Sequence, residues 1–137
     1  MRVVIDTNVF ISSFFGGNPR KIVELWKNGE ITLCVNREII EEYVGVLQRL
    51  DFHKEVEIDE LLSLFARGFN LLFSTKKYNL KIVENDPEDD KFFECVVSLK
   101  AKFIISGDKE VLSIKKYMDI DIVTPVDFLK MFSEMNR

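Results

Sequence analysis

Acidic residues in four separate segments are the best candidates for chemistry in this sequence: Asp6, Glu41 or Glu42, one of Asp86, Asp89 and Asp90, and Asp108. Carboxylates that are brought together repel one another, and each opposes the ionisation of its neighbours. A divalent cation removes that penalty, and hard oxygen ligands suit Mg²⁺ or Mn²⁺ better than zinc. Such a cation activates water and neutralises phosphate charge. These acidic segments therefore predict a divalent-metal site that can activate water, provided that the fold gathers them.

The strands that must position these acids are short, apolar and rich in β-branched residues, which is typical of buried strands. We expect them at Arg2–Ile5, Ile31–Val35, Lys102–Ile105 and Asp121–Val123, with a further candidate near Leu80–Val83 in the ambiguous segment Lys76–Val83. Asp6 follows the first strand directly, and Asp108 comes shortly after the strand that ends at Ile105. Both acids should therefore lie at the carboxyl edge of one sheet.

Helical patterns alternate with these strands. We expect helices at Thr7–Phe15, Asn18–Asn28, Asn36–Leu50, Ile58–Leu72, Glu88–Leu99 and from Thr124 to the C-terminus. Caps support several starts, because Asn18, Asn36 and Thr124 each precede a helical pattern. The alternation predicts an α/β fold, with a mainly parallel sheet and helices on both faces. In such sheets, ligands bind beyond the carboxyl ends of the strands.

Length and composition set broad limits on the function. The chain has 137 residues, the usual size of one domain, and 47% are hydrophobic while 31% are charged, which suits a compact core. Its apolar runs are too short to span a bilayer, and the start does not resemble a secretory signal, so we expect a cytoplasmic protein without a membrane anchor. A net charge of −4 argues against broad electrostatic adhesion to nucleic acid, but not against a local basic rim.

Residues that support other chemistries are scarce. We expect the two cysteines, Cys34 and Cys95, to be buried free thiols, since neither belongs to a metal-binding cluster. The single histidine, His53, has no evident acidic partner and is expected to be a surface or packing residue. A nuclease or hydrolase that depends on histidine is therefore hard to build from this sequence.

Four segments around the acids resemble, in order and spacing, the motifs of the PIN-domain family. They are VVIDTNVF around Asp6, NREIIEEY around Glu42, DPEDDKFFEC around Asp89 and AKFIISGDK around Asp108. The resemblance covers the whole chain and implies a single PIN-like domain over residues 1–137, with a Rossmann-like three-layer sandwich.

The resemblance also implies a function. It places Asp6, Glu42, Asp89 and Asp108 on the acidic positions of a Mg²⁺- or Mn²⁺-dependent ribonuclease site, with Thr7, Asn8 and Ser106 as polar supports. Two placements stay open: Glu41 could replace Glu42, although Tyr43 favours Glu42, and Asp86 or Asp90 could replace Asp89.

Several partners follow from the same resemblance. Many small members are toxins of toxin–antitoxin pairs, so an antitoxin protein is expected. The many aromatic and aliphatic residues predict a self-complementary apolar patch and hence a homodimer, which the resemblance also supports. We expect the substrate to be RNA, single-stranded rather than duplex, since an exposed backbone can reach a narrow acidic cleft. Lys109 or Arg37 would contact its flanking phosphates.

Two other functions compete with this one. A phosphohydrolase of the haloacid dehalogenase type would use Asp6 as nucleophile, but such enzymes carry a second aspartate two residues later, where this chain has Asn8. A non-catalytic receiver-like or protein-binding module would need an acid pair at the first strand, which Asp6 and Thr7 do not supply.

Overall fold

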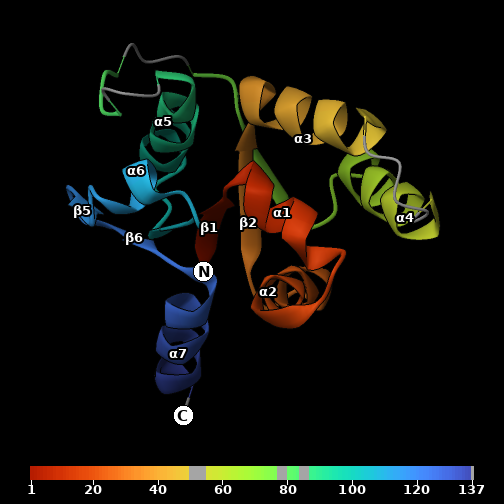
Figure 1. Ribbon diagram of the computed structural model, residues 1–137. Helices are drawn as coiled ribbons and strands as arrows, with labels where there is room; N and C mark the ends of the chain where they lie inside the picture. The colour runs from red at the N-terminus through yellow and green to blue at the C-terminus, as the bar shows by residue number, and fades with distance from the viewer. Residues whose placement is uncertain (50–54, 77–79, 84–86, 137) are drawn as a thin grey trace.

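The computed structural model describes residues 1–49, 55–76, 80–83 and 87–136 of the chain (Figure 1). Its strands are β1 (Arg2–Ile5), β2 (Thr32–Asn36), β3 (Leu71–Ser74), β4 (Phe103–Ile105), β5 (Lys116–Tyr117) and β6 (Ile120–Val123). Its helices are α1 (Thr7–Ser13), α2 (Gly17–Lys27), α3 (Arg37–Arg49), α4 (Glu55–Ala66), the 3₁₀ helix η1 (Pro87–Asp89), α5 (Asp90–Ser98), α6 (Lys109–Leu112) and α7 (Pro125–Met135).

The strands form one sheet in the order β3-β2-β1-β4-β6-β5. Every neighbouring pair is parallel except β5 with β6, which is an antiparallel hairpin at one edge. In Figure 1, α1 and α2 lie in front of the central strands, and α5 packs against β1, β2 and β4. This confirms the expected α/β fold, a mainly parallel sheet flanked by helices.

The register brings the ends of the central strands to one edge of the sheet. Ile5 of β1 pairs with Ile105 of β4, and the backbone N–H of Asp6 donates to the carbonyl of Ile105 at 2.9 Å. The carboxyl ends of β1 and β4 are therefore level with each other. The residues that follow these strands must lie side by side.

Local signals explain most helix starts. The Asn36 side chain accepts the N–H of Ile39 at 2.9 Å at the start of α3, and Thr124 accepts the N–H of Asp127 at 3.2 Å at the start of α7. Both predicted caps are thus confirmed. Helix α2 begins at Gly17, slightly before the expected start, and its N-cap is Gly16 with a positive φ of 96° instead of Asn18.

The core is apolar and rich in aromatic side chains. Trp26, Tyr43 and Phe10 are all almost fully buried, and Phe10 contacts both of the other rings. Cys34 and Cys95 are buried free thiols, as expected, and burial raises the pKa of Cys34 to about 11. Among the described residues, no helix has the length and apolar character needed to cross a membrane.

Two predicted elements are wrong in part. The helix expected at Ile58–Leu72 ends at Ala66, because Gly68 and Asn70 adopt left-handed backbone conformations, with φ of 65° and 49°. The chain then enters β3, where Leu71–Ser74 pairs with Leu33–Asn36. Tertiary pairing with β2 thus overrides the helical spacing of these apolar residues.

The segment near Leu80–Val83 is irregular instead of a strand. The N–H groups of Ile82 and Val83 donate to the Asp90 carboxylate rather than to a neighbouring strand. The short helix α6 and strand β5 were not expected, and the helix predicted at Glu88–Leu99 is divided into η1 and α5. His53 lies outside the described residues.

Candidate active site

Asp6 occupies the centre of the carboxyl edge of the sheet. It is 4% exposed and caps α1, where its Oδ1 accepts the N–H of Asn8 at 3.3 Å. The hydroxyl of Ser106 donates to its Oδ2 at 2.6 Å, which joins the ends of β1 and β4. Asp6 therefore serves as a helix cap and presents a buried carboxylate at the same time.

The electrostatic surroundings of Asp6 disfavour its charge. Burial raises its pKa above the ordinary value, although the hydrogen bonds from Ser106 and Asn8 lower it. The charges of Asp108 and Glu42 raise that pKa further. The structure therefore brings two of the predicted acids, Glu42 and Asp108, within electrostatic reach of Asp6, although the three come from separate segments.

Glu42 is held from both sides of its carboxylate. The Thr7 hydroxyl donates to Oε1, and the ammonium group of Lys91 lies 2.7 Å from Oε2. The next residue, Tyr43, is buried, and its hydroxyl donates to the carbonyl of Ile5. Tyr43 thus fixes α3 against the end of β1, which sets Glu42 beside Asp6.

Glu41 faces a different environment. Its Oε1 pairs with Arg37 at 2.8 Å, and the two side chains are 62% and 76% exposed. Of the two neighbouring acids, Glu42 is the one that contacts the polar groups around Asp6. The arrangement favours Glu42 over Glu41 as the acid of the site. Arg37, which was expected to contact phosphate, is paired with Glu41 instead.

Asp108 lies on the other side of Asp6. Its backbone N–H donates to Ser106 Oγ at 3.0 Å, so Ser106 connects the two acids. Its Oδ1 caps α6 by accepting the N–H groups of Glu110 at 2.8 Å and Val111 at 3.4 Å. As with Asp6, the carboxylate caps a helix, and its charge also acts on the acidic edge. Lys109, which follows it, is exposed.

The acids around the start of α5 have different contacts. Asp90 is buried, and its Oδ1 accepts the N–H groups of Ile82 at 3.0 Å and Val83 at 2.8 Å, which makes it an anchor for that segment. Asp89 ends η1, is partly exposed, and lies two residues before Lys91, whose ammonium group contacts Glu42. Because the N–H groups of Ile82 and Val83 occupy Asp90, the arrangement favours Asp89 over Asp90 as the acid of the site. Asp86 lies outside the described residues.

Two side chains near the acids were not identified from the sequence. Lys91 precedes the buried pair Phe92 and Phe93, so the helical pattern suggests only a solvated residue beside an apolar face. Tyr43 was used only to choose between Glu41 and Glu42. Asn8 was expected as a polar support, but its side chain is exposed and its contact with Asp6 is made through the backbone.

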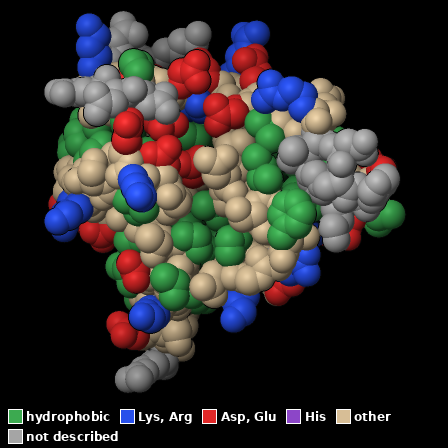
Figure 2. Space-filling view, in the orientation of Figure 1, with side chains coloured by type: hydrophobic (Ala, Val, Ile, Leu, Met, Phe, Trp, Pro, Cys, Tyr) green, Lys and Arg blue, Asp and Glu red, His purple; other side chains and the backbone are tan. Residues whose placement is uncertain are grey.

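The donors around Asp6 fit a hard divalent cation. They are carboxylate and hydroxyl oxygens from Asp6, Glu42, Asp108, Thr7 and Ser106, and Figure 2 shows acidic side chains gathered between α5, α6 and the start of α3. Lys91 already places one positive charge against Glu42. Among the described residues, however, no three Asp, Glu, His or Cys side chains lie in the arrangement of a formed cation cage.

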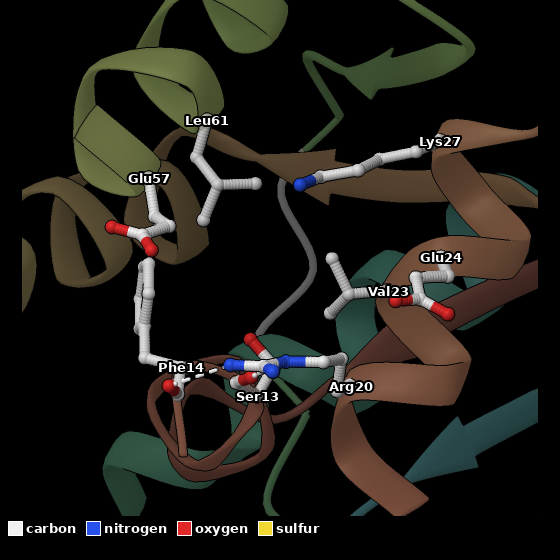
Figure 3. A pocket seen from close by; sticks show the side chains of 8 residues that line it. All are labelled: Ser13, Phe14, Arg20, Val23, Glu24, Lys27, Glu57 and Leu61. Carbon is white, nitrogen blue, oxygen red and sulfur yellow. Dashed lines mark hydrogen bonds between the residues drawn. The ribbon is translucent and has the colours of Figure 1, made fainter. Parts of the chain in front are cut away.

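A separate hollow of about 230 Å³ lies between α1, α2 and α4 (Figure 3). Its two basic side chains are paired within the protein: Arg20 donates to the carbonyls of Ser13 and Phe14, at 3.0 and 2.8 Å, and Lys27 pairs with Glu60 at 2.8 Å. None of the four predicted acids lines this hollow. The chemistry expected of these acids therefore belongs to the acidic edge and not to this hollow.

Comparisons with known proteins agree with this geometry. The sequence model of the PIN domain matches residues 2–110. An uncharacterised protein of Methanocaldococcus jannaschii is 30% identical over 148 aligned positions, which cover 98% of this chain and 93% of the relative. Among solved structures, a chain from the crystal structure of VapBC2 from Rickettsia felis, bound to a DNA fragment from their promoter, resembles the fold. Its TM-score is 0.54 at 14% identity, covering 90% of this chain and 98% of that chain.

Proposed function

Because this chain belongs to the PIN-domain family, whose members are nucleases that generally use divalent metal ions, we propose that it is a Mg²⁺- or Mn²⁺-dependent endoribonuclease. The observation that carries the proposal is the position of Asp6. Its buried carboxylate lies where the charges of Asp108 and Glu42 oppose its ionisation. A divalent cation would reverse that opposition and turn three repelling groups into ligands.

The cation would be held by Asp6, Glu42 and Asp108, directly or through water, with Asp89 as the fourth acid. When bound, it would supply an activated water and neutralise charge on the phosphodiester. Neighbouring hydroxyl groups orient these acids. Ser106 holds Asp6 and the backbone of Asp108, while Thr7 holds Glu42.

The family membership favours this nuclease function over the two alternatives considered above. The structure adds a physical reason against a phosphohydrolase of the haloacid dehalogenase type. Asn8, at the position of the second aspartate, has an exposed side chain and meets Asp6 only through its backbone N–H.

We further propose that the substrate is single-stranded RNA and that the protein is the toxin of a toxin–antitoxin pair. The support is the family resemblance, together with a fold shared with a chain of VapBC2, a complex that its description gives as bound to promoter DNA. A short reading frame next to the gene, encoding a protein that binds this chain and blocks its activity, is the observation that would support the partner. The homodimer and the cytoplasmic location also stay predictions.

The test is cleavage of a fluorescently labelled single-stranded RNA in Mn²⁺, Mg²⁺ or EDTA. We expect wild-type cleavage to need the metal, and Asp6→Asn, Glu42→Gln, Asp89→Asn and Asp108→Asn each to lose at least about 100-fold in rate, since every charge helps to hold the cation. The matched control is Glu41→Gln, which removes an exposed charge beside Glu42 and should cleave at the wild-type rate. Undiminished cleavage in EDTA, or by Asp6→Asn, would contradict the proposal.

A further inference from the structure

Lys91 is bound more firmly at the acidic edge than a surface lysine. Its ammonium group lies 2.7 Å from Glu42 Oε2 and donates to the carbonyl of Glu88 at 2.7 Å. The same nitrogen lies 4.9 Å from the centre of the Phe92 ring. The Lys91 side chain is only 11% exposed, so its charge is held inside the site and not in bulk water.

The ion pair of Lys91 with Glu42 differs from the exposed ion pair of Arg37 with Glu41. Both pairs join a residue of α3 to a cation within 2.8 Å, but the exposed pair has 76% and 62% of its side chains in solvent. Ion pairs of that kind contribute little and rearrange freely. Lys91 makes three contacts at once and is largely buried, so its position relative to Glu42 is fixed by the fold of α5 against the sheet.

Both oxygens of Glu42 are therefore engaged, Oε1 by the Thr7 hydroxyl and Oε2 by Lys91. The contacts of Asp6 and Asp108 are hydrogen bonds and not ion pairs: Asp6 accepts from Ser106 and Asn8, and the Oδ1 of Asp108 accepts backbone N–H groups. The positive charge in the described part of the cluster is thus concentrated on the Glu42 side. Repulsion from a fixed ammonium group disfavours a second divalent ion at Glu42 Oε2, while Glu42 can still reach the ion beside Asp6 through water.

We propose that Lys91 is the second cation of this site: the cluster binds one divalent ion beside Asp6 and Asp108, and the ammonium group occupies the place at Glu42 where a second ion would bind. This inference rests on the proposed function, since it assumes that the acids bind a divalent ion. It assigns Lys91 as a positioning residue, which holds Glu42 in place and sets the number of metal ions.

The test counts Mn²⁺ ions bound per chain, from the electron paramagnetic resonance signal of the free ion during titration of metal-free protein. Wild type should bind one ion. Lys91→Met, which keeps a similar stem but removes the charge, should bind two, and Lys91→Arg should return the count to one. The matched control is Lys109→Met, which removes an exposed charge next to Asp108 and should leave the count at one.

The outcomes separate this inference from the proposed function. A wild-type protein that binds two ions overturns the role of Lys91 without any need for a variant that folds, and so does a folded Lys91→Met that still binds one. In both cases the metal-dependent site itself stands. A wild-type protein that binds no Mn²⁺ overturns both proposals together.

Discussion

Asp6 shows how one residue can serve the fold and the site at the same time. As a cap it accepts the N–H of Asn8, and at the centre of the acidic edge it accepts the hydroxyl of Ser106. Its burial raises its pKa, so the ionised form is disfavoured in the folded protein when no cation is bound. Burying the ionised Asp6 carboxylate therefore lowers the free energy of unfolding of the metal-free protein.

The cost of burying the Asp6 charge predicts how Asp6→Asn changes the stability of the protein with pH. An acid whose folded pKa is raised above its ordinary 3.8 stabilises the fold most below that value, and the contribution is lost as pH rises through the folded pKa. In EDTA near neutral pH, Asp6→Asn should therefore melt at a higher temperature than wild type, and the difference should shrink as pH falls toward about 4. Thermal melts followed by circular dichroism across this range measure it.

The control for that series is Asp119→Asn, in the exposed turn between β5 and β6. It should melt like wild type at every pH, because its carboxylate has no comparable burial. A lower melting temperature for Asp6→Asn than for wild type at neutral pH would show that the cap and the Ser106 contact outweigh the cost of burying the charge.

The positions of Asp6 and Asp108 could be predicted from the ends of the strands that precede them. The short apolar strands before Asp6 and Asp108 place both acids at one edge, and helix spacing places Glu42 near them. Their roles as metal ligands stay predictions. The ammonium group of Lys91 could not be placed, because its contact with Glu42 joins α3 and α5, and no local pattern encodes the packing of two helices.

The link between Asp90 and the segment before α5 is the clearest case of an element held by one side chain. The N–H groups of Ile82 and Val83, which would otherwise lack a strand partner, donate to Asp90 Oδ1. Val83 is buried, so loss of this acceptor leaves a polar group without compensation. The contact also explains why the predicted strand at Leu80–Val83 does not form.

We expect Asp90→Ala to destabilise the protein by about 1–3 kcal/mol, the cost of leaving buried donors unsatisfied. Asp90→Asn keeps an acceptor oxygen and should lose less. Urea unfolding of both variants and wild type gives the comparison. Equal stability of Asp90→Ala and wild type would mean that these hydrogen bonds contribute nothing, and that Asp90 is free to act elsewhere.

Element boundaries were predicted well where caps or strand ends mark them, and poorly where tertiary contacts decide. The caps Asn36 and Thr124 are local signals, and both helices begin there. The end of α4 depends on the left-handed Gly68 and Asn70, and on the pairing of β3 with β2. Helical spacing alone could not reveal a strand that forms only against a distant neighbour.

For the whole molecule, the parallel register is what converts distant sequence positions into one site. Pairing of Ile5 with Ile105 aligns β1 with β4, and the Tyr43 hydroxyl ties α3 to the carbonyl of Ile5. The resulting acidic edge is local, so the modest net charge of −4 does not describe the site. The general fold could be predicted from alternating elements, since that pattern is set by apolar periodicity along the whole chain.

The central claim is that this edge binds a divalent cation through Asp6, and the most direct measurement is the melting temperature with and without Mn²⁺. A ligand that binds only the folded state raises stability by mass action. We expect Mn²⁺ at a concentration well above its dissociation constant to raise the melting temperature of wild type by several degrees, about 2–8 °C, and to leave Asp6→Asn unchanged. An equal rise in both proteins, or none in wild type, would contradict the account.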